Sequence, residues 1–177
     1  MVAMKLHCRF AMLSLAAALA VSTPSHAQQR ALHDPLLDHF IGSSVLTGTI
    51  GKKRTTHDIT AEWVLGHHYV RLHEVSREEL PSGEPEYEAE VYLGWQPRTA
   101  QYGCVWLDVY GNTTPSALAT APRNGNQLAF VFADKESGDF HTTFEYRPAT
   151  DAWLWRMDQE SSGTLSPFAR LTMTRAK

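Results

Sequence analysis

The residues best suited to acid–base chemistry are two carboxylates and two histidines on strand-like segments. His68, Glu74, Asp108 and His141 carry groups that accept and return protons in enzymes. Alternation places Asp108 on the face of Trp106, so its carboxylate would point into an aromatic interior, as catalytic acids often do. The alternative makes Asp108 a cap of the turn that follows. Residue types alone define no nucleophile–base pair, so no catalytic residue is assigned.

The histidines do not form a metal site within one strand. His67 and His68 are adjacent, so they point to opposite faces. His67 and His73 share a face but are about 20 Å apart at the rise of a strand. The segment 134–139 lacks the spacing and final Glu of a calcium loop, so it is predicted to be a hairpin turn. We therefore assign no metal and no cofactor.

The N-terminus resembles a secretory signal. Lys5 and Arg9 precede an apolar run over 10–21, and Ser25-His26-Ala27 resembles a cleavage site. The run is shorter than the roughly 20 apolar residues that a membrane span needs, and no later stretch is longer. The pattern predicts cleavage after residue 27, a periplasmic or secreted protein and no membrane span.

Charge and length limit the partners and the number of domains. Loss of Lys5 and Arg9 with the signal takes the formal charge from −3 to −5. A mildly acidic chain with scattered charge has no electrostatic reason to bind nucleic acid. The remaining residues suit one domain. The expected organisation is a signal peptide over 1–27, a segment with a short helix over 28–42 and a barrel domain over 43–177.

Cys104 is the one cysteine left after cleavage, so no internal disulfide can form. It lies in a run of alternating aromatic residues, and no base is adjacent to it. This predicts a buried small hydrophobe rather than a reactive thiol.

One short helix is predicted before the strands begin. Asp34 is a good N-cap, Pro35 suits the first helical position and Gly42 can end the helix. Its apolar residues would share one face: Leu36, Leu37, Phe40 and Ile41.

From Ser43 onward the hydrophobic pattern has the two-residue period of strands. In the clearest case, Glu86, Glu88 and Glu90 alternate with the apolar residues of 87–95. Ten strands are expected, over 43–50, 57–63, 68–75, 87–95, 102–108, 116–121, 128–132, 140–146, 153–157 and 168–174. Short hairpin turns at regular spacing predict an all-β fold, a single up-and-down antiparallel β-barrel of about ten strands.

Aromatic residues at inward positions are the main indication of function. A ten-stranded barrel has room for a cavity, and aromatic walls with a few polar groups suit a flat or apolar ligand. The alternative is that the rings fill the interior. The candidate cavity-lining residues are Trp63, His68, Tyr87, Trp95, Tyr102, Trp106, Asp108, Phe130, Phe144 and Trp155.

Several segments resemble a known bacterial family of unknown function, DUF1579. "LLDHFIGSSVLTGTI" is similar to the start of small lipocalin-like domains of the calycin type, and "AEWVLGHHYVRLH", "YLGWQPRTAQYGCVWLDVYGN" and "ATDAWLWRM" resemble DUF1579. The matching positions are Trp63, Leu65, Gly66, Gly94, Trp95, Tyr102, Trp106 and Asp108. The resemblance covers roughly 36–175 and implies a lipocalin-like barrel of about ten strands, with no established chemistry. The chain departs from the pattern at 43–45, where Ser-Ser-Val replaces the usual Gly-x-Trp.

A related group of small barrels binds haem through a His near the C-terminus. This chain has no His after His141, so haem binding is not carried over.

Three functions remain open at this stage. The first is a barrel that binds a small hydrophobic or amphipathic molecule without chemistry. The second is a cofactor-free isomerase or hydrolase acting on a hydrophobic substrate, which requires Asp108 or Glu74 to share a cavity with a His. The third is a structural or interaction domain with a filled core. The sequence does not indicate the oligomeric state.

Overall fold

The computed structural model describes residues 34–111, 115–135 and 137–177. The predicted signal peptide and its cleavage point lie outside these residues. No helix within the described ranges is long and apolar enough to cross a membrane. The elements are α1 (Pro35–Asp38), β1 (Gly42–Ile50), β2 (Lys53–Val64), β3 (Tyr69–Ser76), β4 (Glu88–Gln96), β5 (Gln101–Asp108), η1 (Pro115–Ala117), β6 (Leu118–Pro122), β7 (Gln127–Phe132), β8 (Phe140–Arg147), η2 (Pro148–Thr150), β9 (Ala152–Ser161) and β10 (Thr164–Arg175).

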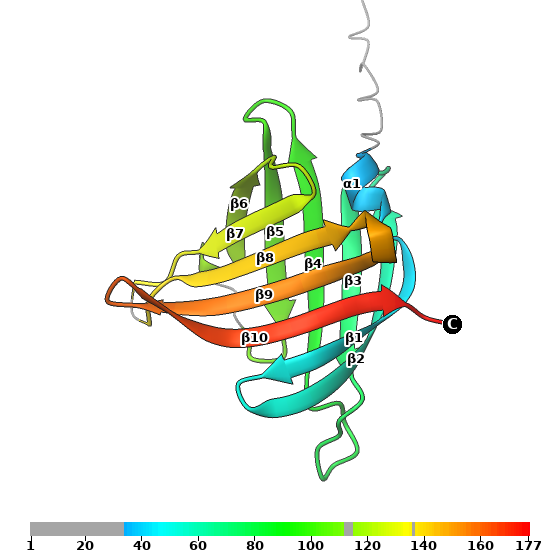
Figure 1. Ribbon diagram of the computed structural model, residues 1–177, viewed down its shortest axis with the longest axis vertical. Coiled ribbons are helices and arrows are strands. Elements are labelled where there is room, and N and C mark those ends of the chain that lie inside the picture. Colours follow the sequence, from blue (N-terminus) through cyan, green and yellow to red (C-terminus); the bar gives the residue numbers. More distant parts are fainter. Residues whose placement is uncertain (1–33, 112–114, 136) are drawn as a thin grey trace, which may run out of the picture. The chain divides into compact units, whose positions relative to one another are not determined.

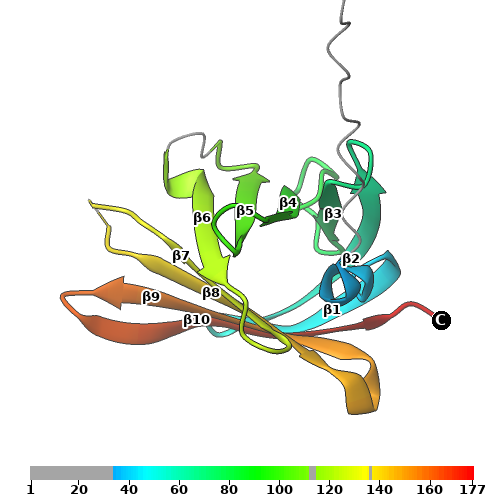
Figure 2. The ribbon, with the colours of Figure 1, turned by 90° about the horizontal axis from the view of Figure 1, so that it is seen from above.

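All ten strands belong to one antiparallel sheet in the order β6-β5-β4-β3-β2-β1-β10-β9-β8-β7. Consecutive strands pair with each other except β6 and β7, and the pairing of β1 with β10 joins the two halves. The edge strands β6 and β7 approach each other without a hydrogen-bonded ladder, so the barrel is nearly closed. Figures 1 and 2 show the sheet curling round in this way. The prediction of an up-and-down barrel of ten strands is confirmed.

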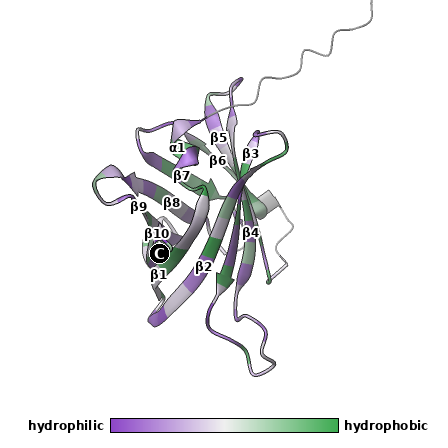
Figure 3. Ribbon diagram, turned by 90° about the vertical axis from the view of Figure 1, so that its right-hand side faces the viewer, coloured by the Kyte–Doolittle hydropathy of each residue, from purple (hydrophilic) through white to green (hydrophobic). Residues whose placement is uncertain are grey.

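The local patterns explain most of the element boundaries. Along β4, Ala89, Val91 and Leu93 are buried, whereas the alternating residues Glu88, Glu90 and Tyr92 face outward. The same alternation of apolar and polar residues is visible along other strands (Figure 3). The expected sixth strand starts later than predicted, at Leu118, because the residues just before it form the 3-10 turn η1.

The helix is shorter than the sequence pattern suggests. Asp34 caps it as predicted, since its Oδ1 accepts hydrogen bonds from the backbone N–H groups of Leu36 and Leu37. The helix ends at Asp38 rather than near Gly42. The chain turns there because Phe40 is directed into the barrel, where it is fully buried.

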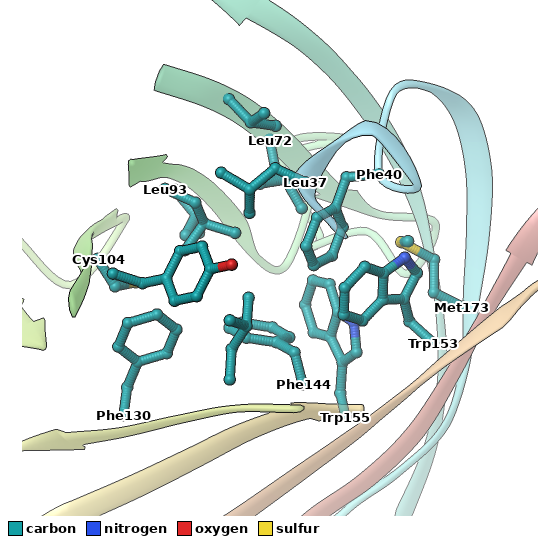
Figure 4. Packing of buried hydrophobic residues seen from close by; sticks show 14 of the residues in the cluster. Leu37, Phe40, Leu72, Leu93, Cys104, Phe130, Phe144, Trp153, Trp155 and Met173 are labelled. Atoms are coloured by element: carbon teal, nitrogen blue, oxygen red, sulfur yellow. The ribbon is translucent and has the colours of Figure 1, made fainter. Parts of the chain in front are cut away.

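One end of the barrel is filled by packed side chains around α1. The Phe40 ring stacks on Trp153 with centroids 3.8 Å apart, and Trp153 Nε1 donates a hydrogen bond to the carbonyl of His39. The buried side chains converge below the helix (Figure 4), among them Leu37, Leu72, Leu93, Cys104, Phe130, Phe144, Trp155 and Met173. Cys104 is fully buried in this core, as predicted, and burial raises the pKa of its thiol.

Candidate functional site

The inward side chains of β3 change character along the barrel. Val70 and Leu72 are fully buried at the α1 end, and the next inward residue is Glu74. Glu74 pairs in register with Ala89 of β4, and Ala89 pairs with Asp108 at the end of β5. Carboxylates on β3 and β5, with Ala89 of β4 between them, therefore replace larger apolar residues at the end away from α1.

A cavity of about 290 Å³ occupies this end of the barrel. The volume lies at the lower limit of sites that bind small molecules. It is lined by Ile50, Glu74, Tyr87, Trp106, Asp108, Tyr110, Ser116, Phe132, Asp134, Ser137, Gly138, Phe140, Thr142, Met157, Gln159, Phe168 and Leu171. Most of this wall is apolar or aromatic. Its charged groups are three carboxylates, and the described part of the lining contains no Lys or Arg.

Glu74 is the most deeply buried charged group of the lining. Its side chain is 3% exposed, and its Oε1 forms a short hydrogen bond with Nδ1 of His57, which is 2% exposed. The second oxygen, Oε2, is buried and has no hydrogen-bond partner among the described residues. A buried carboxylate oxygen without a donor is costly, so this group is available for a ligand that can donate.

The Glu74–His57 pair continues into a hydrogen-bonded chain that leads out of the cavity wall. His57 Nε2 lies 2.6 Å from Thr55 Oγ1, and Thr55 Oγ1 donates to Glu78 Oε2 at 2.9 Å. Burial opposes ionisation of Glu78, but the hydrogen bonds from Thr55 and from the backbone of Thr56 hold the pKa of Glu78 below its ordinary value. Glu78 is therefore an ionised acceptor at neutral pH.

This chain determines how many protons the buried pair holds. Thr55 has one hydroxyl proton and gives it to Glu78, so its oxygen accepts a proton from His57 Nε2. The contact between His57 Nδ1 and Glu74 then contains one further proton, on either the nitrogen or the oxygen. In both arrangements the pair has no net charge.

Tyr87 and Trp106 form a second polar contact on the wall. Trp106 Nε1 donates to Tyr87 Oη at 2.9 Å. Burial, and next the charge of Glu74, raise the pKa of the Tyr87 hydroxyl, so the group stays protonated. Among the described residues the Tyr87 hydroxyl has no acceptor for its own proton. It can therefore donate a hydrogen bond within the cavity.

Asp108 combines both roles considered from the sequence. Its Oδ1 accepts a hydrogen bond from the backbone N–H of Tyr110 at 3.0 Å, which stabilises the turn after β5. Its side chain also lines the cavity. The turn interaction leaves the carboxylate with further lone pairs that face the site.

The rim of the cavity includes the loop between β7 and β8. Gln159 Nε2 lies within hydrogen-bond distance of the carbonyl oxygens of Gly138 and Ser137, which fastens the loop to β9. Gly138 has φ +92°, and a Cβ at this position would collide with the carbonyl oxygen of Glu160. Only glycine allows this close approach of loop and strand. The segment 134–139 is a hairpin connection, as predicted.

Three of the ten predicted cavity residues line the cavity: Tyr87, Trp106 and Asp108. The other seven lie elsewhere in the barrel. Phe130, Phe144 and Trp155 are buried in the packed core between the cavity and the helix. Their rings interlock, and Phe144 and Trp155 meet edge to face at 4.7 Å.

The remaining four candidates lie toward the α1 end. Tyr102 is fully buried and donates to Asp34, and Trp95 packs against the Tyr102 ring at 4.8 Å. Trp63 donates from Nε1 to Asp38 Oδ1 at 2.9 Å. His68 is half-buried and lies in the turn between β2 and β3. The sequence predicted that it would be the first residue of the following strand, but β3 begins at Tyr69.

Sequence reasoning grouped His68, Glu74, Asp108 and His141 as possible acid–base partners. Glu74 and Asp108 do line one cavity, but His141 contacts Glu160 on the outside of the barrel. The histidine that reaches Glu74 is His57, on β2. His57 was not selected, although it shares the inward face of Ile59 and Ala61 in the predicted strand 57–63, so strand alternation was the signal that could have found it.

Within the described ranges, no group of three or more His, Cys, Asp or Glu side chains has a metal-binding arrangement. A second hollow, also of about 290 Å³, lies beside α1 and is lined by residues such as His39, Arg123 and Tyr146. Its walls contain no buried group that lacks a partner among the described residues, so the cavity lined by Glu74 is the candidate site.

Comparison with known proteins supports the fold alone. No protein-family model and no curated protein matches the chain. Among solved structures, the crystal structure of Rv2717c from M. tuberculosis is similar, with a TM-score of 0.50 and 14% identity over 81% of this chain and 99% of that one. At this identity the similarity extends to the barrel architecture, and it assigns no ligand or activity.

Proposed function

We propose that this protein is a secreted or periplasmic barrel that binds a small amphipathic molecule in the cavity at the end away from α1. The observation that carries the proposal is the combination of an apolar wall with the partly unpaired carboxylate of Glu74. Binding sites for small molecules are mostly apolar and contain a few polar groups that orient the ligand. The location follows from the N-terminal pattern, and membership of DUF1579 remains a proposal from the quoted segments.

The first test is native mass spectrometry of the mature protein, residues 28–177, purified from its secretory compartment without detergent. A discrete added mass that disappears on denaturation supports a carrier and identifies its cargo. The bound mass should be absent from Thr142→Phe, because Thr142 is buried and lines the cavity. Thr143→Phe is the matched control, since its side chain points to the other face of β8.

A cofactor-free enzyme is the second candidate, and the Glu74–His57 pair is the observation that favours it. The pair can take a proton from one atom of a bound molecule and return it to another, as an isomerase requires. NMR of the identified cargo, incubated in excess with the protein, decides between the two. Conversion that is lost in Glu74→Gln would assign an enzyme. Recovery of the unchanged molecule would assign a carrier.

Glu88→Gln is the control for that experiment. Glu88 also forms a carboxylate–imidazole pair, with His73 at 2.6 Å, but this pair lies on the outside of β3 and β4. Each of the two substitutions replaces a carboxylate that contacts an imidazole with the same amide, but Glu74 faces the interior of the barrel and Glu88 faces outward.

A further inference from the structure

We propose that the cavity selects an organic cation, namely an amphipathic amine whose ammonium group binds beside Glu74 and whose apolar part lies against the aromatic wall. This rests on the proposed binding function and narrows it to one chemical class. Three independent features of the lining point to this class: an unpaired acceptor, the sign of the charged groups and the aromatic rings.

The unpaired acceptor is Glu74 Oε2. One oxygen of the carboxylate is occupied by His57, and the other is buried without a partner among the described residues. A ligand with an N–H or O–H group could donate a hydrogen bond to this oxygen. An ammonium donor gives the stronger, charge-assisted hydrogen bond. A ligand carboxylate has no proton to donate at neutral pH, so it would leave Oε2 unpaired.

The negative charge of the lining side chains also disfavours the binding of anions. Asp108 and Asp134 add two carboxylates to Glu74, and no Lys or Arg belongs to the described lining. The basic residues adjacent in sequence to lining residues are directed elsewhere, since Lys135 is exposed and both Arg156 and Arg170 form ion pairs with acids outside the lining. Since the Glu74–His57 pair has no net charge, the negative charge comes from the two aspartates. A cation is favoured there over both an anion and a neutral molecule.

The aromatic groups on the same wall suit the same class. Tyr87, Tyr110 and Trp106 line the cavity together with the acids, and the Tyr87 and Tyr110 rings lie 6.1 Å apart. Ring faces attract cations, and this attraction strengthens when water is excluded. Phe132, Phe140 and Phe168 provide apolar surface for the rest of the ligand.

The test uses three probes with one skeleton and different head groups: 4-phenylbutylamine, 4-phenylbutan-1-ol and 4-phenylbutanoate. The protein, expressed from its full-length sequence, is titrated with each probe at pH 7 by isothermal calorimetry and by Trp fluorescence. We expect the amine to bind about tenfold or more tightly than the alcohol, and the carboxylate to bind most weakly. Added salt should weaken binding of the amine and leave the affinity for the alcohol unchanged.

Substitutions of individual acids test whether the preference for the amine comes from the residues that line the cavity. Asp108→Asn and Glu74→Gln should each reduce the ratio of amine to alcohol affinity several-fold while the alcohol still binds. Glu88→Gln should leave the ratio unchanged, because this carboxylate lies on the outer face of the sheet and not in the cavity. Circular dichroism verifies the fold of each variant. If Glu74→Gln does not fold, Asp108→Asn decides, because that side chain is only partly buried.

The outcomes separate this inference from the binding function. Equal affinity for amine and alcohol, or a preference for the carboxylate, would overturn the cation class and leave the cavity as a binding site. Failure of all three probes, together with a bare mass in the native spectrum, would overturn the binding function itself. An amine preference that persists in both Glu74→Gln and Asp108→Asn would place the cation outside this cavity and overturn the inference.

Discussion

Asp34 and Glu74 are both buried carboxylates, one at each end of the barrel, with exposed fractions of 4% and 3%. Asp34 is fully used: Oδ1 caps the helix, and Oδ2 accepts from Tyr102 at 2.9 Å and lies 3.4 Å from Arg123. Glu74 has one occupied oxygen and one unpaired oxygen. The Asp34 carboxylate stabilises the fold, whereas the Glu74 carboxylate retains a hydrogen-bond acceptor whose donor would have to come from a ligand.

The same contrast applies to the aromatic residues at the two ends. Around α1, the buried Phe40 ring stacks on Trp153 and meets Phe144 edge to face. At the other end, Phe132 and Phe140 line a cavity of about 290 Å³. The filled-core interpretation therefore holds for one half of the barrel, and a cavity is present in the other. Four experiments test this division.

The largest expected effect is on packing at the α1 end. Phe40→Ala should lower the free energy of unfolding by about 3–5 kcal/mol, because a fully buried ring is replaced by a cavity. Phe140→Ala, at the partly exposed cavity wall, should cost about 1–2 kcal/mol, because the site is already open to solvent. Urea denaturation measures both. Equal losses would contradict the division into a packed and an open end.

The next effect concerns the rim of the cavity. Gly138→Ala should cost about 2–3 kcal/mol, since it adds a collision with the carbonyl of Glu160 to the strain of a positive φ. Gly83→Ala is the control, with φ +86° and open space around the new methyl group, and should cost about 1 kcal/mol. Thermal unfolding of both variants gives the difference. A difference of zero would mean that the loop and β9 do not pack closely.

The two buried carboxylates should respond differently to neutralisation. Asp34→Asn should destabilise the protein by about 1–2 kcal/mol, because the cap and the contacts with Tyr102 and Arg123 all weaken. Glu74→Gln should cost less than about 1 kcal/mol, because only its bond with His57 is at risk. Chemical denaturation compares the two variants. A larger loss for Glu74→Gln would assign it a mainly structural role.

The smallest effect is a shared response to alkali. Burial, followed by the hydrogen bond with Asp34, raises the pKa of Tyr102, and burial, followed by the charge of Glu74, raises that of Tyr87. In the unfolded chain both phenols ionise near pH 10. Their stabilising contribution is therefore complete below pH 10 and is lost as the pH rises above it. Tyr102→Phe and Tyr87→Phe should each flatten the decline of stability between pH 10 and 11, measured by urea denaturation.

Much of the architecture could be predicted because strand alternation is a local property. The glutamates of β4 alternate with buried Ala89, Val91 and Leu93, and the hairpin turns contain Pro and Gly at the positions where the chain reverses. These preferences do not depend on residues far away in the sequence. The cap at Asp34 was likewise visible, since a helix N-cap involves residues two and three positions away.

The site was predicted only in part, because inward orientation does not reveal how far along the barrel a residue lies. Tyr102 and Trp106 share a face of β5, yet one is beneath α1 and the other lines the cavity. Position along the axis depends on register and on which end the helix fills. The pairing of His57 with Glu74 likewise arises from the offset between β2 and β3.

The order of residues was thus sufficient to specify ten strands, their alternation and a capped helix at the entrance to the barrel, because each depends on neighbours in the chain. The division of the interior into a packed half and an open half required the three-dimensional structure. It arises because side chains from all ten strands must share one interior volume, and those near α1 fill it while those near Glu74 do not.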